Sequence, residues 1–384
     1  MLGLKLFCLI AIACSVAYWL AGVGCALVFF GRSRRRAHPS SDFTPPVSIL
    51  RPMRGLDADM EANLQSLAIL DWPCCQLIFG VEDENDPCVP VIRQFLAGHP
   101  DLDAKLVIGA SGGGANRKVN NLKTMLPHAR HDLIILCDSD ASLAPDSIRR
   151  IVQPLADEKT GLTCCPYLWK NPRTLPAAIE ALTFCSEFVP SVLLVEQTTG
   201  LGFALGATVA VRRRCLEEIG GFEAIQDYLA DDYWLGKLIR DRGHKLALSD
   251  YVVNLIHPET TWPQMWLHQL RLVRTYRVCQ PLGFFFSVLT HGTTWATVFL
   301  ILTLGAPLGW TVWIATLGLR LASAMILQTI HLPDRMTTRY FWLLPLRDWC
   351  ATAWWLLAYT GNRVTWRGSS FTLTPDGKLH SARK

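Results

Sequence analysis

The sequence lacks the residue spacings that mark several common functional classes. Its 13 cysteines include the pairs Cys74-Cys75 and Cys164-Cys165, but none has the paired CxxC or Cys/His spacing of a zinc site. It contains no GxxxxGK[ST] phosphate loop, no internal repeat and no interleaved basic and aromatic stripe typical of nucleic-acid binding. We therefore expect no nucleic-acid partner, and reduced cysteines that fill a cytoplasmic core or a membrane span.

Apolar residues are concentrated near the two ends of the chain. Of the 384 residues, 50% are hydrophobic and 14 are Trp, which favours one folded domain joined to membrane segments. Residues 4–30 are almost uncharged, and arginines follow at positions 32, 34, 35 and 36. A long apolar run with its basic flank on the far side is typical of a retained anchor rather than a cleaved signal peptide. We expect residues 1–31 to be a transmembrane anchor, with the following chain on the cytoplasmic side.

A second apolar zone occupies the last third of the sequence. Its two clearest runs, residues 282–304 and 308–330, are each long enough to cross a bilayer. We therefore expect residues 281–331 to form two transmembrane helices.

The apolar run at residues 341–359 is interrupted by Arg347 and Asp348, and charges at mid-bilayer are costly unless they are paired. We expect residues 332–360 to form an interfacial or re-entrant segment, with a full crossing as the alternative. A basic tail follows at residues 361–384. The net charge of +5 lies largely in such membrane-flanking segments, which favours anionic lipid head groups as the contact.

Between the two apolar zones, residues 46–280 alternate short apolar strands with amphipathic helices. Strands are predicted at residues 47–50, 76–81, 104–108 and 133–137, and helices at 57–70, 88–98 and 121–127. This alternation predicts an α/β domain with a parallel, doubly wound sheet. Ligand sites in such sheets lie at the carboxyl ends of the strands, so polar residues that follow a strand are the candidates.

Two carboxylates, Asp138 and Asp140, follow the strand predicted at residues 133–137. The strand is continuously apolar, as expected of a strand buried on both faces. Hard oxygen donors at its end suit Mg²⁺ or Mn²⁺, whose remaining ligands are usually substrate phosphates and water. The alternative is a solvated turn in which Asp140 caps the helix expected near Pro145.

Acidic pairs also follow the second strand and open a later helix. Asp83 and Asp86 lie at the end of the strand at residues 76–81, where carboxylates accept hydrogen bonds from a ribose or a base, or simply form a solvated turn. Asp231 and Asp232 open an amphipathic helix. Either this pair supplies a general base near the metal site, or both acids simply complement the helix dipole at the start of the helix.

Two basic clusters complete the candidates. Asn116, Lys118 and Asn120 follow a glycine run, where Lys118 meets a phosphate or the segment is only a loop leading into a helix. The second cluster is spaced three residues apart: His268, Arg271, Arg274 and Arg277. We expect these residues to share one helical face, which binds either lipid phosphates or a diphosphate leaving group.

Residues 177–194 form a further apolar stretch within the α/β region. Glu180 and Glu187 are spaced on one of its faces. The stretch is either an interfacial helix or an ordinary core helix.

In this order and combination, the motifs resemble the membrane-bound family-2 and family-21-like glycosyltransferases, specifically the ceramide glucosyltransferase family with its bacterial hopanoid-biosynthesis relatives. The resemblance extends from Val47 to the Trp366-Arg-Gly element. It implies a GT-A-like nucleotide-sugar-binding domain with mostly parallel sheet, flanked by transmembrane helices. It also implies a UDP-sugar donor, Mg²⁺ or Mn²⁺, and a membrane lipid acceptor.

The resemblance assigns roles to individual positions. It implies that Asp232 is the catalytic base and that Asp138 and Asp140 hold the metal. The residues for which it implies contacts with the nucleotide-sugar are Asp83, Asp86, Asn116, Lys118, Asn120, Asp138, His268, Arg271 and Arg274. The family's (Q/R)xxRW element is matched in part, because His268 stands where Gln or Arg is expected and Leu272 where Trp is expected. The glycine-rich residues 199–208 are expected to line the acceptor side.

We therefore predict an inverting glycosyltransferase of the bacterial inner membrane, with its catalytic domain facing the cytoplasm. Asp232 takes the proton of an acceptor hydroxyl that attacks the anomeric carbon, while the metal, Arg271 and Arg274 neutralise the leaving diphosphate. The donor is UDP-N-acetylglucosamine or UDP-glucose, and the acceptor is a hopanoid polyol or ceramide. Sugar transfer to polyprenyl phosphate is the enzymatic alternative, and a membrane scaffold or transport component is the non-enzymatic one.

Overall fold

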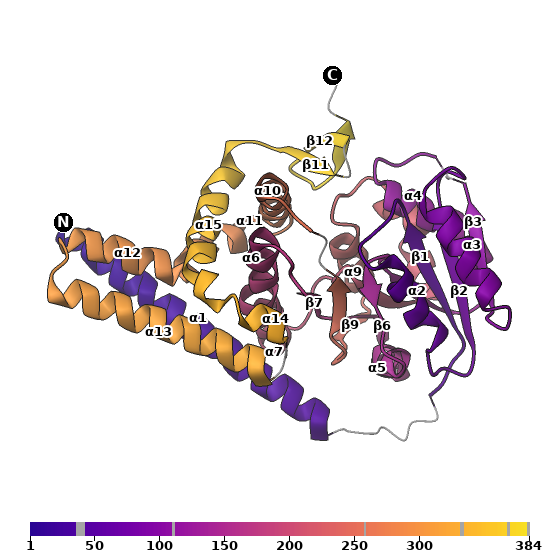
Figure 1. The fold of residues 1–384 in the computed structure, drawn as a ribbon, viewed down its shortest axis with the longest axis horizontal. Helices are drawn as coiled ribbons and strands as arrows, with labels where there is room; N and C mark the ends of the chain where they lie inside the picture. The colour runs from indigo at the N-terminus through magenta and orange to yellow at the C-terminus, as the bar shows by residue number, and fades with distance from the viewer. Residues whose placement is uncertain (36–42, 110–111, 257–258, 331–333, 367–368, 382–384) are drawn as a thin grey trace.

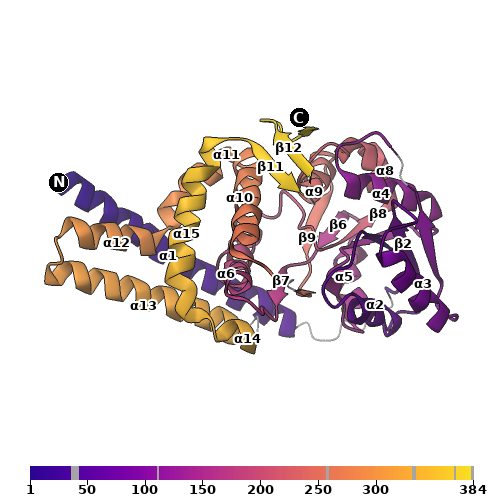
Figure 2. The same cartoon turned by 45° about the horizontal axis from the view of Figure 1, so that its top comes forward.

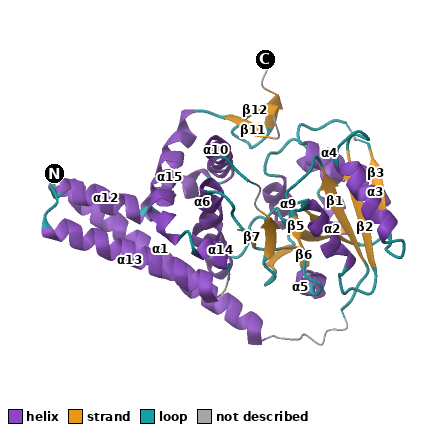
Figure 3. Cartoon of the chain, viewed as in Figure 1, coloured by secondary structure: helices purple, strands orange, loops and turns teal. Residues whose placement is uncertain are grey.

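The computed structural model describes residues 1–35, 43–109, 112–256, 259–330, 334–366 and 369–381. Figure 1 shows two regions side by side: an α/β domain and a region made almost entirely of helices. Colouring by secondary structure makes the division plain, because the strands gather in one half of the molecule (Figure 3). Arg36 of the basic flank, Arg367 and Gly368 of the Trp366 element, and tail residues 382–384 lie outside the described residues.

The α/β domain contains a seven-stranded sheet with the order β3-β2-β1-β4-β8-β6-β9. Its strands are β1 (Val47–Met53), β2 (Cys75–Val81), β3 (Ala104–Ile108), β4 (Leu133–Cys137), β6 (Thr160–Cys164), β8 (Thr208–Arg212) and β9 (Lys245–Leu248). The first four are mutually parallel, as predicted, and β6 is parallel to β9. Strand β8 departs from the parallel prediction, because it pairs antiparallel with both β4 and β6. The sheet is therefore mostly parallel but mixed.

Helices cover both faces of this sheet. On one face, α2 (Met60–Ala68), α3 (Cys88–Gly98) and α5 (Ser147–Val152) pack in a core that includes Ile135 of β4. On the other, α4 (Arg117–Met125), α8 (Arg213–Glu218) and α9 (Asp231–Asp241) pack in a core that includes Ile134. Neighbouring side chains of a strand point to opposite faces of the sheet. Because helices cover both faces, the side chains on each face need to be apolar. All five residues of β4 are buried, which explains its continuous apolar run.

Two small sheets flank the main one. The first has the order β5-β10-β7 and contains β5 (Ala141–Ser142), β7 (Tyr167–Lys170) and β10 (Val253–Ile256). The second is an antiparallel sheet near the C-terminus formed by β11 (Arg363–Trp366), β12 (Ser369–Leu373) and β13 (Leu379–Ser381).

In the helical region, α1 (Leu2–Arg35), α12 (Gly292–Leu302) and α13 (Pro307–Ile330) lie side by side in both views (Figure 1, Figure 2). Further helices are α6 (Leu175–Thr183), α7 (Val189–Thr198), α10 (Trp262–Cys279), α11 (Pro281–Phe286), α14 (Arg335–Thr338) and α15 (Leu344–Leu357). A turn of π-helix, Phe184–Phe188, joins α6 to α7.

Within the described residues, three helical stretches are long and apolar enough to cross a membrane: Leu2–Arg32, Leu175–Thr198 and Pro307–Thr329. A further pair, Pro281–Thr290 with Gly292–Leu302, passes the same test but is bent by 51°. The run at residues 282–304, expected to form a transmembrane helix, is therefore bent between two helical segments, and its crossing of the membrane stays a prediction. The stretch Leu175–Thr198 is 67% buried over its most apolar window, which fits the core-helix interpretation better than the interfacial one.

The charges that interrupt the last apolar run are paired inside the helical region. Asp348 Oδ2 accepts from Arg320 Nε of α13 at 3.1 Å, and Asp348 Oδ1 lies 2.9 Å from Arg347 Nη1. Helix α15 has 14 residues, a length that is short for a crossing. The interfacial or re-entrant placement of residues 332–360 stays a prediction.

We expect Asp348→Asn to lower the free energy of unfolding by about 3–5 kcal/mol, because it removes one partner of a buried ion pair. The Arg320 side chain is only 2% exposed, so water cannot replace the lost carboxylate, and Glu187, at 3.5 Å, is left to balance both Arg320 and Arg347. Thermal unfolding of the protein in detergent micelles measures the effect. Asp59→Asn, which disrupts the exposed Arg173–Asp59 pair, is the matched control and is expected to change stability little. Equal stability of the two variants would contradict this account of the pair.

Candidate active site

A cavity of about 1040 Å³ extends from the carboxyl ends of β1 and β4 into the helical region. Its lining includes Asp138 and Asp140 after β4, Asp232 on α9, Arg271 on α10 and Arg320 on α13. Residues that are far apart in the sequence therefore line one cavity. The edge of the sheet expected to carry a ligand site is part of this space.

The loop that carries Asp138 and Asp140 is held by a buried arginine. Arg51, at the end of β1 and 1% exposed, donates from Nη2 to the carbonyl oxygens of Ser139 and Ala141 at 2.7 and 2.8 Å. Sequence reasoning did not assign a role to Arg51. A charged side chain inside an otherwise apolar strand was the available signal. Asp140 does not cap the helix expected near Pro145, because α5 starts after Asp146, and Asp140 is only partly exposed.

Asp140 lies among negative charges. Burial, with the charges of Asp138 and Asp57, raises the pKa of Asp140 to about 7. Within the described part of the chain, no group of three or more His, Cys, Asp or Glu is arranged to hold a metal. The two hard carboxylate donors, Asp138 and Asp140, nevertheless fit Mg²⁺ or Mn²⁺, because these ions accept water and phosphate as their remaining ligands.

Lys118 lies between this acidic pair and the next. Its Nζ is 2.6 Å from Asp138 Oδ1 and 3.6 Å from Asp231 Oδ2. Asn116 caps α4 by accepting from Val119 N at 3.2 Å, and its Nδ2 donates to Asp231 Oδ1 at 3.3 Å. The structure thus brings together Asn116, Lys118 and the acidic start of α9. Asp231, which sequence reasoning left without a role of its own, is the residue that joins them.

Asp232 is fixed by a close approach between α9 and the glycine-rich segment. A Cβ atom at Gly206 would lie 2.9 Å from Asp232 Oδ2, and one at Gly236 would lie 2.2 Å from the backbone N of Ala204. Only glycine allows this packing at the two positions. Burial and the charge of Asp231 raise the pKa of Asp232 to about 7, against the opposing effect of Lys118. Asp232 is therefore a carboxyl group with a proton affinity suited to base catalysis near neutral pH.

Other predicted donor ligands lie outside the lining of the cavity. Asp83 is exposed and accepts from Asn85 N at 2.9 Å. Asp86 accepts from Gly55 N and Cys88 N at 2.9 and 3.0 Å, and so ties the loop after β1 to α3. Their contact with a nucleotide-sugar stays a prediction.

Asn120, also predicted to contact the donor, closes the glycine loop instead. Its side chain accepts from Gly114 N at 3.2 Å and donates to Gly114 O at 2.7 Å. Asn120 is therefore a residue that shapes the loop before α4, and a direct donor contact stays a prediction.

The basic cluster on α10 does not form one face. His268 and Arg271 line the cavity, and His268 Nδ1 is 2.5 Å from Glu180 Oε1. Arg274 donates instead to the carbonyl oxygen of Arg363, and the Arg277 guanidinium lies 5.6 Å from the Tyr359 ring centroid. The expectation of a single face is wrong, because each step of three residues falls about 60° short of a full turn. Nine residues along the helix, from His268 to Arg277, the side chain therefore points to the opposite side. Donor binding by Arg274 stays a prediction.

The sequence pattern of glycosyl transferase family 21 matches residues 7–379. The chain belongs to this family. Ceramide glucosyltransferase 1 of Caenorhabditis elegans is 29% identical over 209 residues, which are 54% of this chain and 44% of that protein. The ceramide glucosyltransferase of Komagataella phaffii is 34% identical over 158 residues, 40% of this chain and 31% of that protein. Beta-monoglucosyldiacylglycerol synthase of Trichormus variabilis is 24% identical over 215 residues, 55% of this chain and 44% of that protein.

The chain spans less than half the length of these curated relatives. Among solved structures, the mannosyltransferase of Pyrobaculum calidifontis in complex with GDP-Man and Mn²⁺ is similar to it, with a TM-score of 0.51 and 20% sequence identity. The similarity covers 91% of this chain and 98% of that one. It confirms the predicted GT-A-like fold for this family 21 chain.

The C-terminal sheet of the family 21 chain braces the segment that leads to Asp231 and Asp232. Leu379 N donates to Asp227 O at 2.7 Å, and the Tyr228 ring stacks on Trp234 with a centroid distance of 4.4 Å. Phe371 of β12 lines the cavity. Sequence reasoning predicted only a basic tail here, although the alternating apolar residues Phe371 and Leu373 of β12 were a signal for a strand.

We expect Gly377→Ala to reduce the activity of this family 21 protein by loosening the C-terminal sheet. Gly377 has φ +90°, and a Cβ atom there would lie 2.9 Å from Trp234 Nε1. Gly243→Ala is the matched control, because Gly243 has φ +93° but open space around its Cβ position. Both variants carry similar backbone strain, about 1 kcal/mol. Sugar transfer should fall several-fold further in the Gly377 variant, and equal activity would refute the bracing role.

Proposed function

We propose that this chain is an inverting glycosyltransferase that moves one sugar from a UDP-sugar to a hydroxyl of a neutral membrane lipid. The observation that carries the proposal is the shared cavity, in which Asp138, Asp140 and Asp232 face a space that continues among candidate membrane helices. Membership of family 21 and relatives named for ceramide and diacylglycerol products support it. The acceptor is a hopanoid polyol or ceramide, and the donor carries glucose or N-acetylglucosamine.

In the proposed reaction, Asp232 accepts the proton of the acceptor hydroxyl while its oxygen bonds to the anomeric carbon. The bond between that carbon and the diphosphate breaks, and its electron pair leaves with UDP. Attack from the opposite face inverts the anomeric centre. Arg271 lines the same cavity, and in this proposal its cation balances the charge that develops on the diphosphate. Mg²⁺ or Mn²⁺, when held by Asp138 and Asp140, supplies further positive charge to the leaving group.

Sugar transfer should depend on pH through Asp232. Because the pKa of Asp232 is raised to about 7, the base is protonated and unavailable at lower pH. We expect kcat/KM to fall about tenfold per pH unit below that value and to level off above it. Asp231→Asn should move the fall to lower pH, since the Asp231 charge contributes to the raised pKa. A pH profile between 5 and 9 measures both, and a flat wild-type profile would contradict the assignment.

The enzymatic alternative requires a clamp for the phosphate of a polyprenyl phosphate acceptor. Half of the basic cluster expected to form such a clamp contacts the tail instead: Arg274 donates to the carbonyl oxygen of Arg363, and Arg277 donates to Asn362 Oδ1. This arrangement favours a neutral acceptor.

We further propose that the protein lies in the bacterial inner membrane with its α/β domain on the cytoplasmic side, because a basic flank follows the first apolar helix.

Acceptor choice tests the proposal. Purified protein in mixed micelles receives labelled UDP-glucose or UDP-N-acetylglucosamine with Mn²⁺, and either ceramide, a hopanoid tetrol or polyprenyl phosphate. We expect labelled product from a neutral lipid only, with the linkage inverted relative to the donor. Product from polyprenyl phosphate alone would establish the alternative. No transfer and no donor hydrolysis under any condition would favour a scaffold or transport component.

A further inference from the structure

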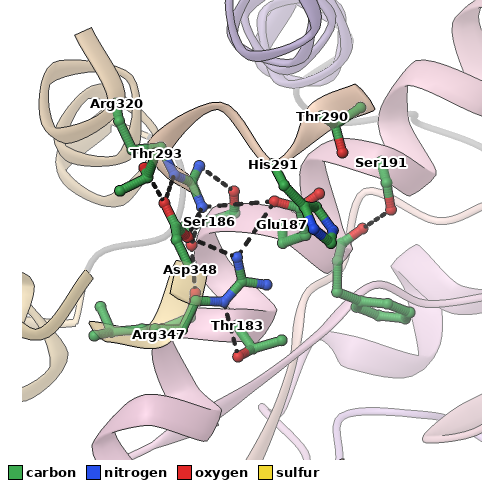
Figure 4. A network of polar contacts seen from close by, with 12 residues as sticks. Thr183, Ser186, Glu187, Ser191, Thr290, His291, Thr293, Arg320, Arg347 and Asp348 are labelled. Atoms are coloured by element: carbon green, nitrogen blue, oxygen red, sulfur yellow. Dashed lines mark hydrogen bonds and ion pairs between the residues drawn. The ribbon is translucent and has the colours of Figure 1, made fainter. Parts of the chain in front are cut away.

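Away from Asp232, the cavity has a second polar cluster within the helical region (Figure 4). We call Glu187, Ser191, Thr290 and His291 the inner cluster; all four line the cavity. They come from the π-turn, from α7 and from the bend between α11 and α12. The mechanism proposed above does not use any of them.

The charges around the inner cluster balance one another. Glu187 Oε2 lies 3.5 Å from both Arg320 Nη2 and Arg347 Nη1, and Asp348 pairs with the same two arginines. Two cations thus meet two carboxylates. Glu187 is the most accessible of the four, with 27% of its side chain exposed against 7% or less for the others. A ligand that enters here meets a carboxylate first, which disfavours a phosphate group.

The Ser191 and Thr290 hydroxyl groups of the inner cluster both donate to backbone carbonyls, which leaves their oxygens to accept from a ligand. Ser191 Oγ donates its hydrogen to Phe188 O, and Thr290 Oγ1 donates to Ser287 O, each at 2.7 Å. A hydroxyl whose hydrogen is committed in this way retains lone pairs for a ligand. Together with the Glu187 carboxylate, the cluster therefore suits groups that donate hydrogen bonds, such as hydroxyl or amide N–H groups.

Local backbone geometry and the surrounding walls agree with a ligand site. Glu187 lies in a single π-turn, Phe184–Phe188, an irregularity that occurs frequently at functional sites in helices. The cavity wall around it is apolar and aromatic, with Trp19, Phe188, Val192 and Phe284 among its residues. An apolar wall beside a polar cluster, on helices long enough for a membrane, fits a lipid that carries a polar head.

We propose that the inner cluster is a head-group subsite that binds hydrogen-bond donors of the acceptor lipid other than its reacting hydroxyl. This inference rests on the function proposed above and narrows its substrate class. Ceramide has a second hydroxyl and an amide N–H, and a hopanoid polyol has several further hydroxyls. Diacylglycerol has only the hydroxyl that reacts. The subsite therefore selects neutral lipids with several donors, with Glu187 as its main specificity-determining residue.

Two lipids and three variants test the subsite. Wild type, Glu187→Gln and Ser191→Ala are assayed with UDP-sugar and Mn²⁺ in micelles that contain ceramide or 1,2-diacylglycerol. Glu196→Gln is the matched control, because it makes the same change on α7 at a position outside the cavity lining. Donor KM should stay close to wild type. The thermal unfolding midpoint is also measured, because Glu187→Gln removes a carboxylate from beside the buried Arg320 and Arg347 and a general loss of stability would affect both lipids equally.

We expect wild type to prefer ceramide by at least about tenfold in kcat/KM. Glu187→Gln should lower kcat/KM for ceramide by about 10- to 100-fold through a higher acceptor KM, with less than a threefold change for diacylglycerol. Ser191→Ala should cause a smaller loss of the same kind, and Glu196→Gln none.

Equal losses on both lipids, or unchanged ceramide kinetics in the Glu187 and Ser191 variants, would overturn the subsite while the proposed function stands. Wild type is also offered polyprenyl phosphate; transfer to this acceptor alone, or to no lipid, would instead overturn the proposed function, and the subsite with it. The lipid panel thus separates the two failures.

Discussion

Asp232→Asn is expected to reduce sugar transfer by about 10³-fold while leaving UDP-sugar binding intact. Asparagine has nearly the same shape as aspartate, so the contact with Gly206 and the packing of α9 should be preserved. Its amide cannot accept the proton of an attacking hydroxyl. The substitution therefore removes the chemistry but keeps the architecture. Initial rates with saturating lipid, together with calorimetric titration of the donor, separate the two quantities.

Asp241→Asn is the matched control for this substitution. Asp241 lies on the same helix, α9, where it pairs with Lys237 in solvent, 2.7 Å from its Nζ. We expect the control to keep near wild-type transfer. Substantial transfer by Asp232→Asn, within tenfold of wild type, would rule out Asp232 as the base.

Asp138→Ala is expected to weaken metal-dependent donor binding by about 100-fold or more, given that even indirect partners of a metal site are worth 10- to 100-fold. The substitution removes one of the two carboxylates proposed to hold the cation, and with it the partner 2.6 Å from Lys118 Nζ. Titration of UDP-sugar with and without Mn²⁺ measures the effect.

Chelation gives this second prediction an internal control. EDTA should weaken donor binding by wild type about as much as Asp138→Ala does, and should have little further effect on the variant. Donor binding by wild type that is insensitive to EDTA would refute the metal assignment, whatever the effect of the substitution.

Local patterns in the sequence predicted much of the α/β domain. Strands β3 and β4 have the predicted bounds, Ala104–Ile108 and Leu133–Cys137, because a short apolar run between polar turns defines a buried strand without reference to the rest of the chain. Helix α4 begins at Arg117, four residues earlier than predicted, since Asn116 caps it with its side chain. Capping by asparagine is a local signal that was present in the sequence.

Features that depend on pairing between distant segments were missed. No local pattern identifies the partner strands of β8, which pairs antiparallel with β4. The same holds for the contact between the C-terminal sheet and Asp227. In the last apolar run, nothing local indicated a partner for the charge of Asp348. Its partner, Arg320, lies 28 residues away in the sequence. A lone arginine inside an apolar helix was the signal that a partner had to exist.

The candidate site shows the same division. The carboxylates Asp138, Asp140 and Asp232 could be identified as chemistry-bearing residues, and the structure places all three on one cavity. Arg51 and Glu187 could not be placed from sequence, because their importance depends on which loop or cavity the fold brings against them.

The most direct test of the account is the product formed by membranes that contain this protein. They are incubated with labelled UDP-glucose and labelled UDP-N-acetylglucosamine, with Mn²⁺ or with EDTA, and the extracted lipids are identified by mass spectrometry. We predict one sugar on a neutral hydroxylated lipid, formed with Mn²⁺ but not with EDTA, and absent for Asp232→Asn. A labelled polyprenyl phosphate, a polymer, or the same product from the Asp232→Asn membranes would contradict the account.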